Sequence, residues 1–200
     1  MTDDTLSYTI GDNLYLNITD RCTLVCEFCP KTQGSLQVHD YDLSLKHRPE
    51  YAEIVAAIGD PKDYAEIVFC GFGEPTLRLK ILLQLAAYIK ENGGKVRLNT
   101  DGLACLVNKR DVLPEMQGLI DAVSVSMNTH KEDLYIRHCA PQLQGAWAAM
   151  LDFLERAPAY IPDVTATAID GLEGVDIRAC EKLAAKLGVK FRARQLDIVG

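Results

Sequence analysis

The most constraining feature of this chain is the regular alternation of short strand-like segments with longer amphipathic ones. Apolar residues recur at helical spacing between the strand-like segments, and glycines follow several of these stretches where helices are expected to end. This alternation predicts a parallel sheet with right-handed crossovers. The expected strands are Asn13–Thr19, Glu66–Cys70, Lys95–Asn99, Ala122–Met127, Val164–Ile169 and Val189–Gln195. No linker or repeat divides the chain, so we expect a single domain over residues 1–200.

Polar and apolar residues alternate within several of these strands. Leu14 and Leu16 alternate with Asn13 and Tyr15, and the same pattern recurs in the third, fourth and sixth strands. Parallel strands buried on both faces are usually apolar throughout. A sheet that curls around a wet, ligand-filled interior instead presents one polar face. Because six strands are too few for a closed eight-stranded barrel, the sequence predicts an α/β fold, an open partial (β/α)6 barrel of TIM-like type.

Three of the seven cysteines lie within eight residues, directly after the first expected strand. Cys22, Cys26 and Cys29 have the spacing C-x3-C-x2-C. Thiolates suit zinc and iron–sulfur clusters. A cluster that only carries electrons normally takes four cysteine ligands, so three would leave one iron open for substrate chemistry. The alternative is a Cys3His zinc site, with His39 or His47 as the fourth ligand.

Four motifs together resemble a known family. An aromatic residue, Phe28, directly precedes the third cysteine, and CGFGEP (70–75) follows the second strand. NTDG (99–102) ends the third strand, and VSVSMN (123–128) forms the fourth. With these four motifs in this order, the chain resembles the radical S-adenosylmethionine (SAM) superfamily over nearly its whole length. The detailed runs, such as GFGEPTLR and DAVSVSMN, are most similar to the subgroup of radical SAM proteins associated with TatD-family nucleases.

The resemblance implies an enzyme with one [4Fe–4S] cluster held by Cys22, Cys26 and Cys29. In such enzymes an electron from the cluster cleaves SAM to methionine and a 5′-deoxyadenosyl radical, which abstracts hydrogen from a substrate, here unknown. The resemblance further implies contacts between the protein and SAM. The residues implied are Phe28 against the adenine; Gly71, Gly73 and Glu74 near the methionyl amino group; and Asn99, Asp101, Ser126 and Asn128 at the strand ends that hold the ribose or carboxylate.

One departure from the family pattern is Phe72, which replaces the first glycine of G-G-E-P. Several residues outside the motifs are weaker candidates. Arg192 and Arg194 alternate on the last strand, where they would either bind a carboxylate or form a solvated edge. Tyr135 and His138 would face the mouth of the barrel. The remaining cysteines are expected to be ordinary thiols rather than ligands of an auxiliary cluster: Cys70, Cys105, Cys139 and Cys180. The basic run Lys46-His47-Arg48 is expected to be solvated.

The charge balance and the lack of visible targeting signals limit which partners and which location we expect. The net charge of −7 disfavours sequence-independent nucleic-acid binding. No membrane span or secretory signal is visible, so we expect a cytoplasmic protein. Expected partners are SAM, an electron donor such as flavodoxin or ferredoxin, and a TatD-type nuclease or a macromolecular substrate. The alternatives are a glycyl-radical-activating or 7-deazaguanine-synthase-like enzyme and, in another class, a non-catalytic zinc-stabilised binding module.

Overall fold

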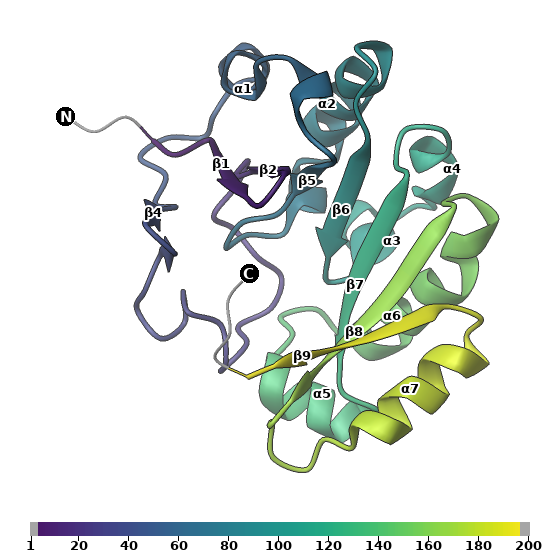
Figure 1. The fold of residues 1–200 in the computed structure, drawn as a ribbon. Helices are drawn as coiled ribbons and strands as arrows, with labels where there is room; N and C mark the ends of the chain where they lie inside the picture. Colours follow the sequence, from purple (N-terminus) through teal and green to yellow (C-terminus); the bar gives the residue numbers. More distant parts are fainter. Residues whose placement is uncertain (1–3, 197–200) are drawn as a thin grey trace.

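A seven-stranded sheet organises the fold of the computed structural model, which describes residues 4–196. Six strands are parallel and run in the order β2-β5-β6-β7-β8-β9, as the strand–helix alternation predicts. Figure 1 shows these strands fanning out from β2 to β9 rather than lying flat. The six strands are β2 (Asn13–Leu16), β5 (Ile67–Phe69), β6 (Val96–Thr100), β7 (Ala122–Asn128), β8 (Asp163–Asp170) and β9 (Lys190–Gln195).

The seventh strand, β1 (Ser7–Ile10), is antiparallel and was not predicted. It forms a hairpin with β2 through a two-residue turn at Gly11 and Asp12, in which Gly11 has a φ of 57°. A glycine followed by an acidic residue between two apolar runs is a known hairpin signal. A second hairpin, β3 (Gln37–Val38) with β4 (Tyr41–Asp42), lies in the long loop after the cysteines.

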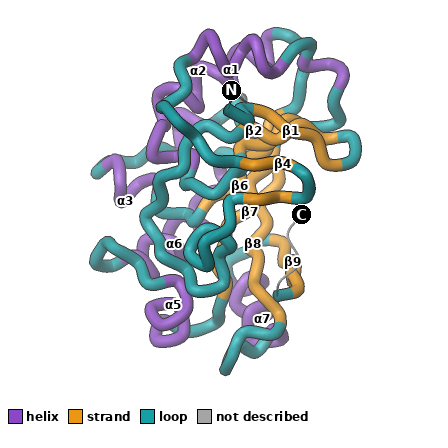
Figure 2. The backbone as a smooth tube through the Cα atoms, turned by 90° about the vertical axis from the view of Figure 1, so that its left-hand side faces the viewer, coloured by secondary structure: helices purple, strands orange, loops and turns teal. Residues whose placement is uncertain are grey.

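The helices pack on the apolar face of the sheet and form one large core with it. Figure 2 shows α2, α3, α5 and α6 to the left of the strands, with α1 above and α7 below. The helix between β6 and β7 that follows α3 is short, Leu113–Met116. No helix in the described part is long and apolar enough to cross a membrane. The helices are α1 (Tyr51–Ile58), α2 (Leu79–Glu91), α3 (Ala104–Asn108), α4 (Leu113–Met116), α5 (Glu132–Cys139), α6 (Ala146–Arg156) and α7 (Ile177–Lys186), with 3-10 turns at Pro61–Asp63, Pro75–Arg78 and Ala157–Ala159.

The opposite face of the sheet carries the polar residues of the alternating strands. In β6, Val96 and Leu98 are fully buried against the helices, whereas Arg97 and Asn99 point to the concave side. The same division separates the leucines of β2 from Asn13 and Tyr15. Polar side chains from every parallel strand but β5 therefore line the interior of a partial barrel, which confirms the interpretation of the alternating pattern.

Candidate metal and cofactor site

A cavity of about 500 Å³ opens at the carboxyl ends of the parallel strands. All eleven residues that the sequence motifs single out line it, although they come from four separate segments of the chain. This is the end of an α/β barrel where active sites form. The eleven residues are Cys22, Cys26, Phe28, Cys29, Gly71, Gly73, Glu74, Asn99, Asp101, Ser126 and Asn128.

The loop that carries the cysteines is fastened to the end of α5. The backbone N–H groups of Val25 and Glu27 donate to the carbonyl oxygens of Cys139 and His138, both at 3.0 Å. The Glu27 carboxylate also bonds the His138 ring, with 2.5 Å between Oε1 and Nδ1. Because two backbone bonds and one side-chain bond span residues 25–27, the loop between the first and third cysteines is held in a defined position.

The three thiols lie on the wall of the cavity and are half-buried. Burial raises the pKa of Cys22 to about 12, with the nearby acidic side chains Asp101 and Glu74 adding to the effect. The pKa of Cys26 is also raised, first by a hydrogen bond with Cys139 and then by burial. Without a cation, Cys22 and Cys26 are therefore neutral thiols. Iron binds the thiolate and so overcomes a raised thiol pKa, and the Leu24 N–H, 3.5 Å from Cys22 Sγ, is placed to stabilise that charge.

The donor set fits a cluster better than a single zinc ion. Within residues 4–196, no three histidine, cysteine, aspartate or glutamate side chains are grouped so that they hold one metal ion. Neither proposed fourth ligand lies at the cavity: His39 is exposed, and His47 pairs with Asp4 at 3.1 Å and Glu53 at 2.8 Å. Three motif thiols on one cavity wall, with no histidine among the described residues that line the cavity, match the donor set of a cluster with one open iron.

Gly73 brings the turn after β5 against the start of the cysteine loop. A Cβ atom at Gly73 would lie 2.2 Å from the Thr19 carbonyl oxygen and 2.7 Å from that of Arg21. The next residue adds a hydrogen bond to this contact: the Glu74 N–H donates to the Arg21 carbonyl oxygen at 2.7 Å. Phe72, the departure from the family motif, packs away from this contact, against the small cluster around Val38. The close backbone contact is therefore made by Gly73, the motif glycine that this sequence retains.

Glu74 and Asp101 form a buried carboxyl pair at the floor of the turn. Glu74 is 3% exposed; its Oε1 accepts from the Thr76 and Thr100 hydroxyls at 2.6 and 2.8 Å, and its Oε2 accepts from the Asp101 N–H at 2.7 Å. Asp101 accepts bonds from the Thr23 hydroxyl and, at 2.9 Å, from the Leu103 N–H. Burial, with the neighbouring Asp101, raises the pKa of Glu74 to about 8. The Glu74 side chain thus holds the turn after β6 in place.

Asn128 and Arg194 form the rim at the ends of β7 and β9. Asn128 has a φ of 63°, in the left-handed region that asparagine tolerates better than most residues. Its amide donates to Cys139 Sγ at 3.3 Å, and its carbonyl oxygen accepts from Arg194 at 3.3 Å. Arg194 and Arg192 both line the cavity and are also exposed on the edge strand β9, so neither of the two predicted descriptions is excluded.

Residues 16–187 match the profile of the radical SAM superfamily. The chain belongs to the radical SAM superfamily. It is 31% identical over 123 residues to the tungsten-containing aldehyde ferredoxin oxidoreductase cofactor-modifying protein of Pyrococcus furiosus, covering 58% of this chain and 30% of that protein. It is 35% identical over 86 residues to Fe-coproporphyrin III synthase of Methanosarcina barkeri, covering 43% of this chain and 20% of that protein.

Two solved structures have a fold similar to that of this chain. TYW1 with a lysine-pyruvate adduct bound has a TM-score of 0.66 at 16% identity, covering 94% of this chain and 66% of that chain. Methylornithine synthase (PylB) has a TM-score of 0.53 at 13% identity, covering 92% of this chain and 53% of that chain. These likenesses support the radical SAM type of partial barrel. The chain spans 30% and 20% of the lengths of the two curated relatives that it matches.

Two residues at this cavity were not found from the sequence. Thr23 bonds Asp101, and Cys139 contacts Cys26, but neither has a spacing that marks it. Of the weaker candidates, Tyr135 is buried in the core beside Trp147, with 5.4 Å between ring centroids, and does not face the mouth. Cys180 is buried in the core, as predicted. Cys70, in contrast, is only partly buried and lines the cavity.

Proposed function

We propose that this chain provides the catalytic core of a radical SAM enzyme, with one [4Fe–4S] cluster bound by Cys22, Cys26 and Cys29. The observation that carries the proposal is the single cavity in which the three thiols face polar groups from several strands. When bound, the cluster supplies the electron that cleaves SAM to methionine and a 5′-deoxyadenosyl radical, which removes a hydrogen atom from the substrate.

The chain's own residues bind and orient SAM in this proposal. Phe28 offers an apolar face to the adenine, and the backbone around Gly73 approaches the methionyl amino group closely because no side chain intervenes. The remaining contacts are polar groups at strand ends that are suited to the ribose hydroxyls and the carboxylate. These groups belong to Asn99, Asp101, Ser126 and Asn128, with Arg194 as an added carboxylate partner.

The finer assignments rest on the sequence motifs alone. We propose membership of the TatD-associated subgroup on the runs around residues 71–78 and 121–128. A flavodoxin or ferredoxin donor and a TatD-type nuclease or macromolecular partner are proposed with it. The two curated relatives are named for different substrates, so their names favour neither this subgroup nor the activating and ring-contracting alternatives. Superfamily membership leaves the zinc-stabilised module without support.

The test is SAM cleavage by anaerobically reconstituted, reduced protein without added substrate. We expect 5′-deoxyadenosine and methionine in equal amounts from the wild type and from Cys105→Ala, which alters a thiol that does not line the cavity. Cys29→Ala should form neither product. Failure of the wild type to form 5′-deoxyadenosine, with a full complement of iron and sulfide, would refute the proposal.

A further inference from the structure

The end of α5 lies directly behind the cysteine loop. The backbone N–H groups on both sides of Cys26 donate to carbonyl oxygens at the end of this helix, each at 3.0 Å. Two side chains of the helix, Tyr135 and Cys139, are fully buried and belong to none of the sequence motifs. Because they are four residues apart, they lie on the same face of the helix. Neither of them lines the cavity, so the proposed contacts with SAM leave both without a role.

The hydroxyl group of Tyr135 has no hydrogen-bond partner among residues 4–196, although its oxygen is inaccessible. The ring is held by packing against Trp147, with 5.4 Å between the ring centroids. A buried hydroxyl without a partner lowers the stability of a fold, because it has given up its bonds to water. Native proteins therefore satisfy nearly all such groups. The groups that surround Tyr135 indicate which acceptor would do so here.

Four titratable groups act on the charge of Tyr135, and all of them lie around the cysteine loop. Burial, followed by Cys139, Asp101, Cys26 and Cys22, raises the pKa of the Tyr135 hydroxyl. The hydroxyl therefore keeps its proton and is available as a donor. Two of these four groups are the thiols of proposed cluster ligands. Their sulfur atoms become negatively charged acceptors when iron binds them as thiolates.

Cys139 makes a second contact from the same helix. Its side chain is hydrogen-bonded to that of Cys26, and its Sγ accepts from the Asn128 amide nitrogen at 3.3 Å. Arg194 donates to the Asn128 oxygen at 3.3 Å, which orients the amide nitrogen towards Cys139. A thiolate has no proton to give. When Cys26 binds iron, the Cys139 S–H is therefore the donor of the bond between them.

We propose that Tyr135 and Cys139 donate hydrogen bonds from α5 to the cysteine sulfur atoms that bind the cluster, and that these bonds raise its reduction potential. Reduction adds negative charge to the cluster and its sulfur ligands, so a donor stabilises the reduced form more than the oxidised form. Both are positioning residues, because they act through Cys22 and Cys26 rather than on SAM or the substrate. The inference rests on the cluster of the proposed function, and it assigns to α5 the control of how readily that cluster accepts an electron.

The experiment measures the midpoint potential of the reconstituted cluster, in an anaerobic redox titration followed by EPR. Tyr135→Phe removes only the hydroxyl, and Cys139→Ala removes the thiol. We expect each to shift the potential to more negative values, by about tenfold in the reduction equilibrium or about 59 mV for one electron. Cys139→Ser keeps a donor and should lie nearer to the wild type than Cys139→Ala. The matched control is Tyr160→Phe, outside the cavity lining and after α6, which should leave the potential unchanged.

The chain before reconstitution gives a second readout, which does not depend on the cluster. In that state the Tyr135 hydroxyl has no bond to lose, so Tyr135→Phe should unfold at the same denaturant concentration as the wild type or at a higher one. Unfolding at a lower concentration would overturn the proposal, because it would show that the hydroxyl already has a partner.

Three further outcomes separate this proposal from the function on which it rests. An unchanged or more positive potential in either Tyr135→Phe or Cys139→Ala would overturn it. A loss of iron in Cys139→Ala as complete as that in Cys26→Ala would make Cys139 a ligand and would also overturn it. Wild-type protein that binds no iron and sulfide would instead refute the proposed cluster itself, and with it this inference.

Discussion

Glu27 and His138 contact each other twice, through the backbone at 3.0 Å and through their side chains at 2.5 Å. Glu27 lies between the second and third motif cysteines, and His138 is at the end of α5, 111 residues further along the chain. The other ring nitrogen of His138 donates to the Glu173 carbonyl at 2.8 Å. A histidine that is only 1% exposed thus connects the cysteine loop, α5 and the loop after β8.

His138→Ala should loosen the cysteine loop. The variant removes two hydrogen bonds of a buried ring, which we expect to lower the free energy of unfolding by about 1–3 kcal/mol. It should also reduce the iron bound per chain after reconstitution. Arg137→Ala, on the exposed side of the same helix, removes an ion pair with Glu173 and should change neither quantity appreciably. Iron content in His138→Ala equal to that of Arg137→Ala would show that this connection does not position the loop.

Gly73→Ala should be more damaging than Gly71→Ala. The added methyl at position 73 meets two backbone carbonyl oxygens, which move only if the chain before Cys22 moves. At position 71 it meets the side-chain oxygen of Asn17 at 2.7 Å, and a side chain adjusts more cheaply. We expect Gly73→Ala to lose about 1–3 kcal/mol of stability in chemical denaturation. It should also lose SAM affinity in equilibrium binding. Equal losses in the two variants would contradict the backbone contact.

The buried pair of Glu74 and Asp101 should make stability pH-dependent. Because the pKa of Glu74 rises from 4.5 to about 8 on folding, the folded chain holds this proton where the unfolded chain has released it. The contribution is therefore fully present below about pH 4.5 and is lost as the pH rises to 8. Between pH 5 and 8, the free energy of unfolding of the wild type should fall relative to that of Glu74→Gln. Denaturation curves at several pH values measure this, and parallel pH profiles would contradict the burial effect.

Much of the fold follows from residue patterns that are local. The alternation around Leu14 and Leu16 predicts a polar interior because side chains on a strand alternate between two faces, and the structure confirms it. The four motifs follow strands one after another, so a parallel sheet must bring them to one edge. All eleven predicted site residues accordingly line one cavity. Their roles toward a cluster and SAM stay predictions.

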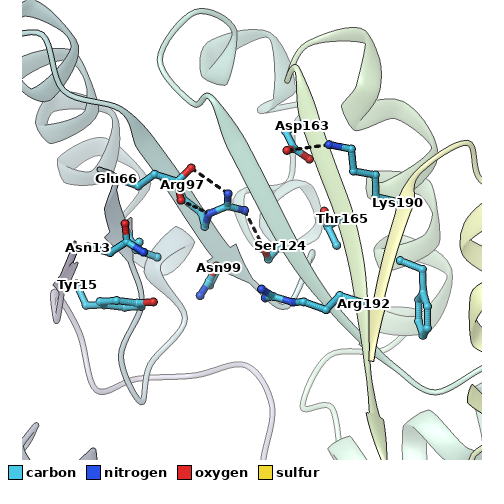
Figure 3. Close-up of a pocket in the computed structure, with 12 residues that line it drawn as sticks. Asn13, Tyr15, Glu66, Arg97, Asn99, Ser124, Asp163, Thr165, Lys190 and Arg192 are labelled. Carbon is cyan, nitrogen blue, oxygen red and sulfur yellow. Dashed lines mark hydrogen bonds and ion pairs between the residues drawn. The ribbon is translucent and has the colours of Figure 1, made fainter. Parts of the chain in front are cut away.

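The parts that the sequence did not reveal depend on contacts between distant segments. Cys139 contacts Cys26 only because α5 returns beneath the cysteine loop, and no spacing in the chain encodes that distance. The bonds of Glu74 to Thr76 and Thr100 likewise exist only in the folded chain. A second cavity, of about 440 Å³, combines two motif residues, Asn99 and Ser124, with polar residues near the beginnings of strands that no motif marks, such as Asn13 and Arg97 (Figure 3).

The most direct test of the central claim is quantification of iron, sulfide and zinc after anaerobic purification and reconstitution. The variants are Cys26→Ala and a matched control, Cys180→Ala, which removes a buried helical thiol outside the cavity. The account predicts about four irons and four sulfides per chain in the wild type and in Cys180→Ala, and a nearly complete loss in Cys26→Ala. One zinc per chain without sulfide, or an intact cluster in Cys26→Ala, would contradict it.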